Sequence, residues 1–148
     1  MSDGFKFGLQ KLLEVREEKE EESKRLFTKS QREKQITEKK LQDLTDSYDK
    51  YKGIGQGESI VYQKVKKNYL IAVEKGITST TKELKVKDNE LEFRRRDLLR
   101  KQVERKTVDI LKEKQLTAFK NEQNRLEAIA NDEFALYAYI RNHRKEVR

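Results

Sequence analysis

The strongest constraint on the fold is an apolar residue that recurs every seven positions through the second half of the chain. The repeat begins at Leu70, Ile77, Leu84, Leu91 and Leu98, lapses at Arg105 and Lys112, and resumes at Phe119, Leu126 and Ile140. A companion row holds Val73, Thr80, Val108, Ile129 and Leu136. A heptad repeat kept in phase over this length is typical of a coiled coil, and neither chance nor disorder would preserve it.

An earlier stripe supplies a candidate partner for this helix. Alternate steps of four and three lead from Leu9 to Leu13, Arg16, Glu20, Ser23, Phe27, Ser30, Lys34, Thr37, Leu41, Leu44, Tyr48 and Tyr51. Both ends of the stripe are apolar, and its middle is polar or small. The pattern predicts a second helix with one buried edge, packed less well at its centre.

Composition separates a two-helix protein from a compact globule. Only 34 % of the 148 residues are apolar and 42 % are charged, which is too little to fill a globular core. A seam between two helices needs only about two apolar positions in seven. Disorder is the competing interpretation of this composition, and the sustained repeat argues against it.

Glycines mark the reversal between the two stripes. Pro is absent, and three of the six glycines are Gly53, Gly55 and Gly57, which can adopt the positive φ angles of a tight reversal. Ser59 follows as a cap for the next helix. We therefore predict an all-α protein whose two long helices form an antiparallel coiled-coil hairpin. Residues 1–148 would form one domain, with a helix over about 7–52, a turn at 53–58, and a longer, overhanging helix over about 59–142.

A turn centred near residue 56 also predicts a register. The numbers of partner residues should add up to about 112, which pairs Phe27 with Leu84 and Leu13 with Leu98 or Leu99. Leu9 then meets Val103, Leu44 meets Tyr69, and Tyr48 meets Val65. The acidic run within residues 17–22 would lie opposite Arg94, Arg95 and Arg96. Residues beyond about 104 would lack a partner and expose Phe119, Leu126, Ile129, Phe134, Leu136, Tyr137 and Ile140, a set typical of a binding surface. The alternatives are that this end folds back as a third helix or frays.

The sequence lacks the common catalytic motifs. No phosphate-binding, dinucleotide-binding, zinc-protease or nucleophile-elbow motif occurs, and the glycine cluster is followed by Glu58 without a Lys-Ser/Thr pair. There is no Cys, and His143 is the single histidine. We expect no enzyme activity, no cofactor, no metal and no small-molecule substrate.

The net charge of +8 leaves three kinds of partner open: nucleic acid, anionic lipid and an acidic protein. The densest basic stretch holds Arg94, Arg95, Arg96, Arg100, Lys101, Arg105 and Lys106. Asp97 and Glu104 interrupt it and no aromatic residue is interleaved, so a solvated and partly paired helix face is favoured over nucleic-acid binding. Tyrosines near the turn are equally typical of a seam and of a binding hot spot.

Three segments resemble the FliJ family, a component of the bacterial flagellar type III export apparatus. They are Phe5-Lys6-Phe7-Gly8-Leu9-Gln10-Lys11-Leu12-Leu13-Glu14-Val15-Arg16-Glu17, the run from Arg105 to Lys114, and Asn131-Asp132-Glu133-Phe134-Ala135. Each segment is weakly specific alone, and their order and spacing carry the resemblance. It implies an antiparallel two-helix coiled coil similar to the γ rotor of the rotary ATP synthase, without catalysis of its own.

The resemblance also implies partners and contact residues. Family members associate with the hexameric export ATPase FliI and with the cytoplasmic part of the export gate protein FlhA. The hairpin tip would contact the gate through Leu44, Tyr48, Tyr51, Tyr69 and Val73, whereas Gly76 and Thr80 continue that surface with smaller side chains than expected. The chain ends and basic band would contact the ATPase ring through Arg16, Arg94, Arg95, Arg96, Arg100, Arg105, Asp132 and Glu133.

From these implications we expect a non-enzymatic adaptor or stalk that supports export and chemotactic motility. Export chaperones are further possible partners. The protein should be cytoplasmic and associate with the inner face of the membrane through the gate, since no signal peptide or membrane span is present. Two other hypotheses stay open at this stage: a basic coiled coil that binds nucleic acid, and the central stalk of another rotary ATPase.

Overall fold

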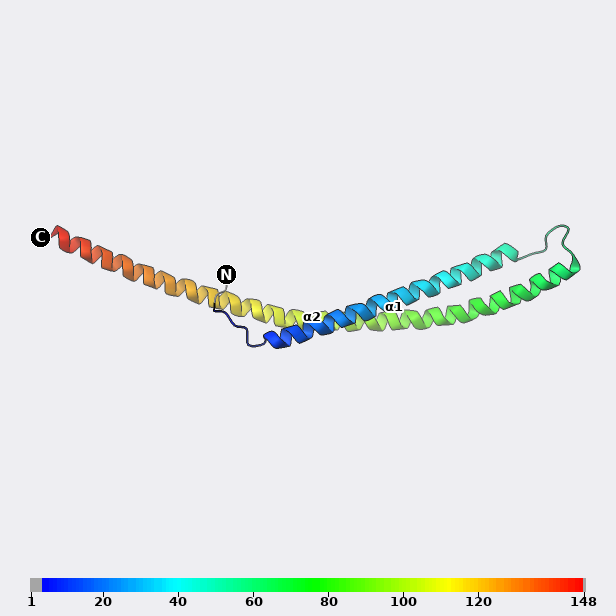
Figure 1. The fold of residues 1–148 in the computed structure, drawn as a ribbon, viewed down its shortest axis with the longest axis horizontal. Coiled ribbons are helices and arrows are strands. Elements are labelled where there is room, and N and C mark those ends of the chain that lie inside the picture. The colour runs from blue at the N-terminus through cyan, green and yellow to red at the C-terminus, as the bar shows by residue number, and fades with distance from the viewer. Residues whose placement is uncertain (1–3, 148) are drawn as a thin grey trace. The chain divides into compact units, whose positions relative to one another are not determined.

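The computed structural model describes residues 4–147 and contains two α-helices, α1 (Gln10–Tyr51) and α2 (Ile60–Glu146). Figure 1 shows them with the connecting segment between them. No strand occurs among the described residues. Because α1 has 42 residues and α2 has 87, the prediction of an all-α hairpin with a longer second helix is confirmed. Both helices are rich in Glu, Lys, Leu and Arg, which favour helix, and neither contains Pro.

Contacts divide the chain into two compact units, which we describe in turn. One comprises Met1–Glu17 with Val103–Arg148, and the other is Glu18–Gln102. The organisation of residues 1–148 as a single domain stays a prediction.

The turn lies in the unit Glu18–Gln102 and has the predicted chemistry. Gly53 and Gly57 have φ angles of 86° and 81°, a conformation that residues with a Cβ atom rarely adopt. Ser59 caps α2, because its Oγ accepts a hydrogen bond of 3.2 Å from the backbone N–H of Tyr62. The Ser59 cap is therefore confirmed, and of the three glycines expected to adopt positive φ, Gly53 and Gly57 do so whereas Gly55 does not.

The seam of this unit uses the two stripes that the sequence predicts. On α1 the stripe residues between Glu20 and Tyr51 are all buried or half-buried, and on α2 so are Leu70, Val73, Ile77, Thr80, Leu84, Leu91 and Leu98. Small polar residues occupy much of the buried seam, namely Ser23, Ser30, Thr37 and Thr80. Only Val73 and Leu91 are buried apolar residues here, so hydrophobic stabilisation of the seam is modest.

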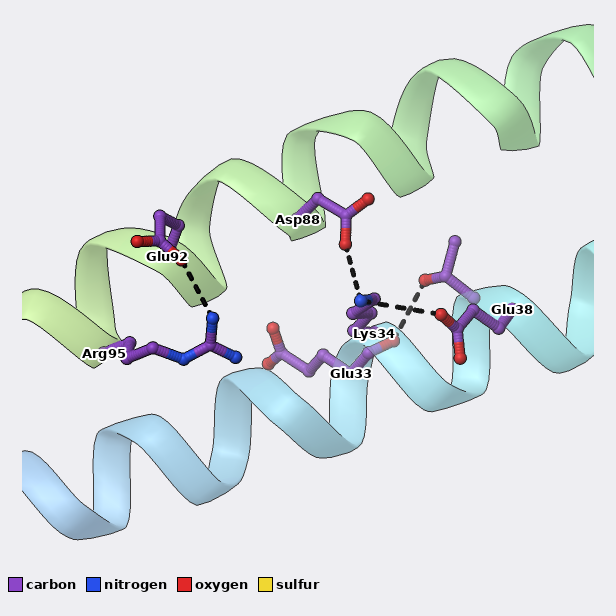
Figure 2. A network of polar contacts seen from close by, with 7 residues as sticks. Glu33, Lys34, Glu38, Asp88, Glu92 and Arg95 are labelled. Atoms are coloured by element: carbon purple, nitrogen blue, oxygen red, sulfur yellow. Dashed lines mark hydrogen bonds and ion pairs between the residues drawn. The ribbon is translucent and has the colours of Figure 1, made fainter.

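Polar contacts between the helices define their register. Ser23 Oγ donates a hydrogen bond of 2.9 Å to Asp97 Oδ2, and Lys34 Nζ lies 2.8 Å from Asp88 Oδ1. Figure 2 shows Lys34 of α1 between Asp88 of α2 and Glu38 of its own helix. The hydrogen bond that Lys34 donates to the Asp88 carboxylate raises the pKa of Lys34. The partner numbers add up to 120 and 122 in these two pairs, so the predicted sum of about 112 is wrong.

The error arises because the turn is asymmetric. The segment after α1 continues beyond the end of that helix and contacts the first turns of α2, where Glu58 Oε1 forms an ion pair of 2.9 Å with Lys66 Nζ (Figure 1). Gln63 Nε2 also donates to the Glu58 carbonyl at 3.3 Å. As a result, Tyr51 at the end of α1 meets Tyr69 rather than the first residues of α2, with ring centroids 5.5 Å apart.

The corrected register replaces each pairing that the sequence predicted. Phe27 lies between Ser23 and Lys34, which face Asp97 and Asp88, so its pairing with Leu84 is wrong. Leu44 meets Gly76 rather than Tyr69, because a Cβ atom at Gly76 would lie 3.5 Å from Leu44 Cδ1. The arginines at 95 and 96 form ion pairs with Glu92, one turn earlier on α2, instead of with the acidic run of α1.

The unit formed by the two chain ends has its own small core. Phe7, Leu13 and Val108 are buried together, with Phe5 packed against them. Leu13 therefore packs with Val108 and not with Leu98 or Leu99. The core is bordered by a 2.8 Å hydrogen bond from Lys112 Nζ to Gln10 Oε1.

Pairing in this unit extends further along α2 than predicted. The rings of Phe5 and Phe119 lie 5.6 Å apart, so the predicted loss of a partner after about residue 104 is wrong. Two causes combine, namely the register offset and the segment before α1, which continues along α2. From residue 120 to 147 every residue is exposed except the half-buried Ala130, and α2 stays helical to Glu146 rather than folding back as a third helix.

Candidate partner-binding surfaces

The tyrosines of the predicted gate-binding set meet at the end of α1. Tyr51 and Tyr69 pack edge to face, with an interplanar angle of 87°. Tyr69 is exposed, Tyr51 is half-buried, and Tyr48 is half-buried one turn earlier. An edge-to-face pair with one accessible ring is a rigid, amphipathic contact surface of the kind found in binding hot spots.

The aliphatic members of the same set lie inside the seam. Val73 is 5 % exposed, and Thr80, which the sequence places on the continuation of this surface, is 2 % exposed. Leu44 is half-buried and lies against Gly76, where an added Cβ atom would make ordinary van der Waals contact with it. Val73 and Thr80 are thus covered while α1 and α2 remain paired, and Leu44 is partly covered.

The structure places a different group of apolar residues on the surface at the turn. Ile54 and Ile60 are 78 % and 73 % exposed, and Val61, Tyr62 and Val65 are also exposed. Tyr62 is one of the tyrosines near the turn that the sequence left open as seam or hot spot. The aliphatic members were missed, and the wrong register paired Val65 with Tyr48. A signal was present: Ile60, Val61 and Val65 do not fall on the heptad positions of Leu70 and Val73. Apolar residues out of phase with a seam indicate a second apolar face.

Positive charge surrounds this apolar group. Residues 50–69 contain five lysines and one acid, Glu58, which gives the segment a formal charge of +4. Lys66 Nζ bonds Glu58 and also lies 5.9 Å from the centroid of the Tyr62 ring. The hydrogen bond from Lys66 lowers the pKa of Glu58. The surface is therefore apolar, aromatic and basic.

Within the unit Glu18–Gln102, the arginines predicted to contact the ATPase ring are held by residues of their own helix. Arg95 and Arg96 bond Glu92 at 3.0 and 3.2 Å, and Arg100 bonds Asp97 at 2.8 Å. Arg94 is half-buried, with its guanidinium carbon 5.5 Å from the centroid of the Phe93 ring. Local pairing lowers the effective charge of this basic band, although the long side chains of Arg95, Arg96 and Arg100 remain exposed.

In the unit of the chain ends, the other residues predicted to contact the ATPase ring fall into two groups. Arg16 Nη1 donates a hydrogen bond of 2.7 Å to the Glu104 carbonyl, and Arg105 forms an ion pair with Asp109. These arginines are half-buried and stabilise the paired region. Asp132 and Glu133 lie instead on the exposed part of α2, which also presents Leu126, Ile129, Phe134, Leu136, Tyr137, Tyr139 and Ile140.

Comparison with known proteins identifies the family. The profile described as Flagellar FliJ protein matches residues 5–144, nearly the full chain. This chain belongs to the flagellar FliJ family. Comparisons with curated proteins and with solved structures gave no match. Family membership supports a role related to flagellar protein export, in which FliJ proteins are a non-enzymatic component.

Two further features are absent from the residues that the structure describes. Among them, no three His, Cys, Asp or Glu side chains are grouped so that they could hold a metal ion. Neither α1 nor α2, over its described residues, is apolar enough along its length to cross a membrane.

Proposed function

We propose that this FliJ-family chain is a non-enzymatic adaptor that links the export gate to the export ATPase. The apolar, basic surface beside the turn binds the cytoplasmic part of FlhA. The exposed end of α2 binds the FliI ring, together with the chain-end residues matched to the family. ATP hydrolysis belongs to FliI, and the adaptor acts in the cytoplasm at the inner face of the membrane.

The observation that carries this proposal is the position of the exposed apolar residues. Exposed apolar residues occur along both helices, but two groups of them lie in separate segments, residues 54–65 beside the turn and residues 126–140 near the end of α2. Single exposed apolar residues are ordinary on a protein surface, but groups of this size mark interaction sites. The two groups belong to different compact units, which supports two partners rather than one.

Retention assays with purified proteins test the proposal. The full chain should retain FliI and, in a separate experiment, the cytoplasmic part of FlhA. A nucleic-acid gel shift at low salt serves as the comparison for a basic coiled coil, because phosphate binding is strongest there. Retention of neither protein would contradict the adaptor function, and a shift without protein retention would favour nucleic-acid binding. Export chaperones can be assayed in the same way.

A further inference from the structure

A shallow hollow lies beside the turn, between the end of α1 and the first turns of α2. It measures about 320 Å³ and is lined by Tyr51, Tyr62, Val65, Lys66 and Tyr69. Three of its five lining residues are tyrosines, and Val65 supplies an aliphatic wall that is 61 % exposed. A second hollow of about 350 Å³ adjoins it and shares Lys66.

Contacts within the lining and with the turn position the side chains of this hollow. The ion pair between Glu58 and Lys66 is shielded, since their side chains are 18 % and 12 % exposed. It holds the Lys66 ammonium near the Tyr62 ring at one rim. At the opposite rim the edge-to-face contact holds Tyr51 against Tyr69. Both rims are thus pre-organised, which lowers the entropic cost of binding.

We infer that this hollow receives an apolar side chain from an acidic segment of a partner protein. The inference rests on the proposed function, in which that partner is the export gate, and it identifies where and by what chemistry the gate is bound. Aromatic walls favour an aliphatic or aromatic side chain, and the phenol hydroxyl groups can bond the backbone around it. The lysines around the hollow select acidic neighbours, consistent with the charge of +4 over residues 50–69.

The concave shape favours a protein over a membrane surface. A lipid bilayer offers no protruding side chain to fill a hollow of 320 Å³ between tyrosine rings. Tyrosine is also enriched in the desolvated centres of protein interfaces. Leu44 and Val73, which were predicted to bind the gate, lie in the seam. Gate binding at the hollow is still compatible with that prediction, because Tyr51 and Tyr69 were predicted to bind the gate and also line the hollow.

The experiment measures binding of the full chain to the cytoplasmic part of FlhA by titration calorimetry. Tyr62→Ala and Val65→Ala remove walls of the hollow, and Val86→Ala is the matched control. Val86 lies on α2 away from the turn and is 63 % exposed, close to the 61 % of Val65. We expect Kd to rise at least about tenfold for Tyr62→Ala and about fivefold for Val65→Ala, and to stay within about twofold for Val86→Ala. Circular dichroism checks that each variant keeps its helices.

Each outcome supports or overturns the inference. Binding of wild-type protein that both hollow variants retain in full would overturn it and leave the proposed function intact. Absence of gate binding by wild-type protein would overturn both. Vesicles of phosphatidylglycerol and phosphatidylcholine are the remaining probe: vesicle binding that Tyr62→Ala abolishes, with gate binding unchanged, would overturn the inference in favour of a lipid contact. Loss of gate binding in the two hollow variants but not in Val86→Ala, together with wild-type binding that is tighter at low salt than at high salt, would support it.

Discussion

At the scale of single residues, two buried serines seven positions apart in α1 have opposite environments. Ser23 Oγ donates a hydrogen bond to Asp97, whereas Ser30 Oγ is buried and has no hydrogen-bond partner. A satisfied hydroxyl adds to stability, and an unsatisfied one lowers it, because the group loses its bonds to water on burial. The same substitution at the two positions therefore separates these effects.

Ser23→Ala should lower the free energy of unfolding by about 1 kcal/mol at neutral pH, since it leaves Asp97 without its strongest partner. Ser30→Ala should leave the free energy unchanged or raise it by up to about 1 kcal/mol, because it removes an unpaired polar atom. Urea denaturation followed by circular dichroism measures both. Equal destabilisation by the two variants would contradict these assignments.

The pH dependence of the Ser23 contact follows from the Asp97 carboxylate. The hydrogen bond from Ser23, assisted by Arg100, lowers the pKa of Asp97 below its ordinary value of 3.8. A group with a lowered pKa contributes stability that is present above the unfolded value and is lost as pH falls through the folded value. The penalty of Ser23→Ala should therefore be full at neutral pH and shrink at about pH 2.5. Unfolding curves at both pH values check this, with Ser30→Ala as the variant whose effect should not change. A penalty for Ser23→Ala that is the same at both values would be inconsistent with a charged acceptor.

At the scale of the helices, register can be tested with cysteines because the chain contains none of its own. Leu44→Cys with Gly76→Cys should form a disulfide under mild oxidation, since a Cβ atom at Gly76 would lie 3.5 Å from Leu44 Cδ1. Leu44→Cys with Tyr69→Cys, the pairing implied by a symmetric turn, should not. Electrophoresis with and without reductant reads the result. Cross-linking of the second pair in preference to the first would mean that the register is wrong.

The two helices and their seam could be predicted from the sequence because a heptad repeat directly encodes which side chains are buried. From Leu13 to Tyr51, the residues of the first stripe are all buried or half-buried. The register could not be predicted, because the same stripes pair nearly as well when they are shifted by whole heptads. Contacts of the turn with α2 resolve this choice, above all Glu58 with Lys66, and periodicity carries no information about them.

The candidate surfaces were predicted less completely, for the same reason. Tyr51 and Tyr69 were expected at the tip and meet there, but Val73 is buried in the seam. Ile60 and Val65 were missed because a symmetric turn would have placed them against α1. Near the end of α2, the exposed apolar residues from Leu126 to Ile140 were expected. The error was that the segment without a partner was predicted to begin near residue 104, which is too early. Phe119 is paired with Phe5 and is not part of it.

At the scale of the whole molecule, the exposed end of α2 makes few contacts with the rest of the chain, so we expect it to be dispensable for folding. A chain that ends at Lys120 keeps Phe5, Phe7, Leu13, Val108 and Phe119, which form the core of the chain-end unit and its border. Its urea midpoint should therefore stay close to that of the full chain. It should lose retention of FliI, because the exposed residues from Leu126 to Ile140 are gone, and keep retention of FlhA. A marked fall in the midpoint, or full retention of FliI, would contradict the assignment of this segment.

The central claim is that one chain must engage both partners, and flagellar subunit export in living cells tests it most directly. Cells without the chromosomal copy would receive the wild-type chain, the chain ending at Lys120, Tyr62→Ala, or the last two together, and secreted flagellar subunits would be measured. If one chain must engage both partners, export should occur with the wild-type chain and should be low when the two defective chains are expressed together, because neither of them links the gate to the ATPase. Restoration of export by that pair to the wild-type level would contradict the claim, since the two surfaces would then act independently.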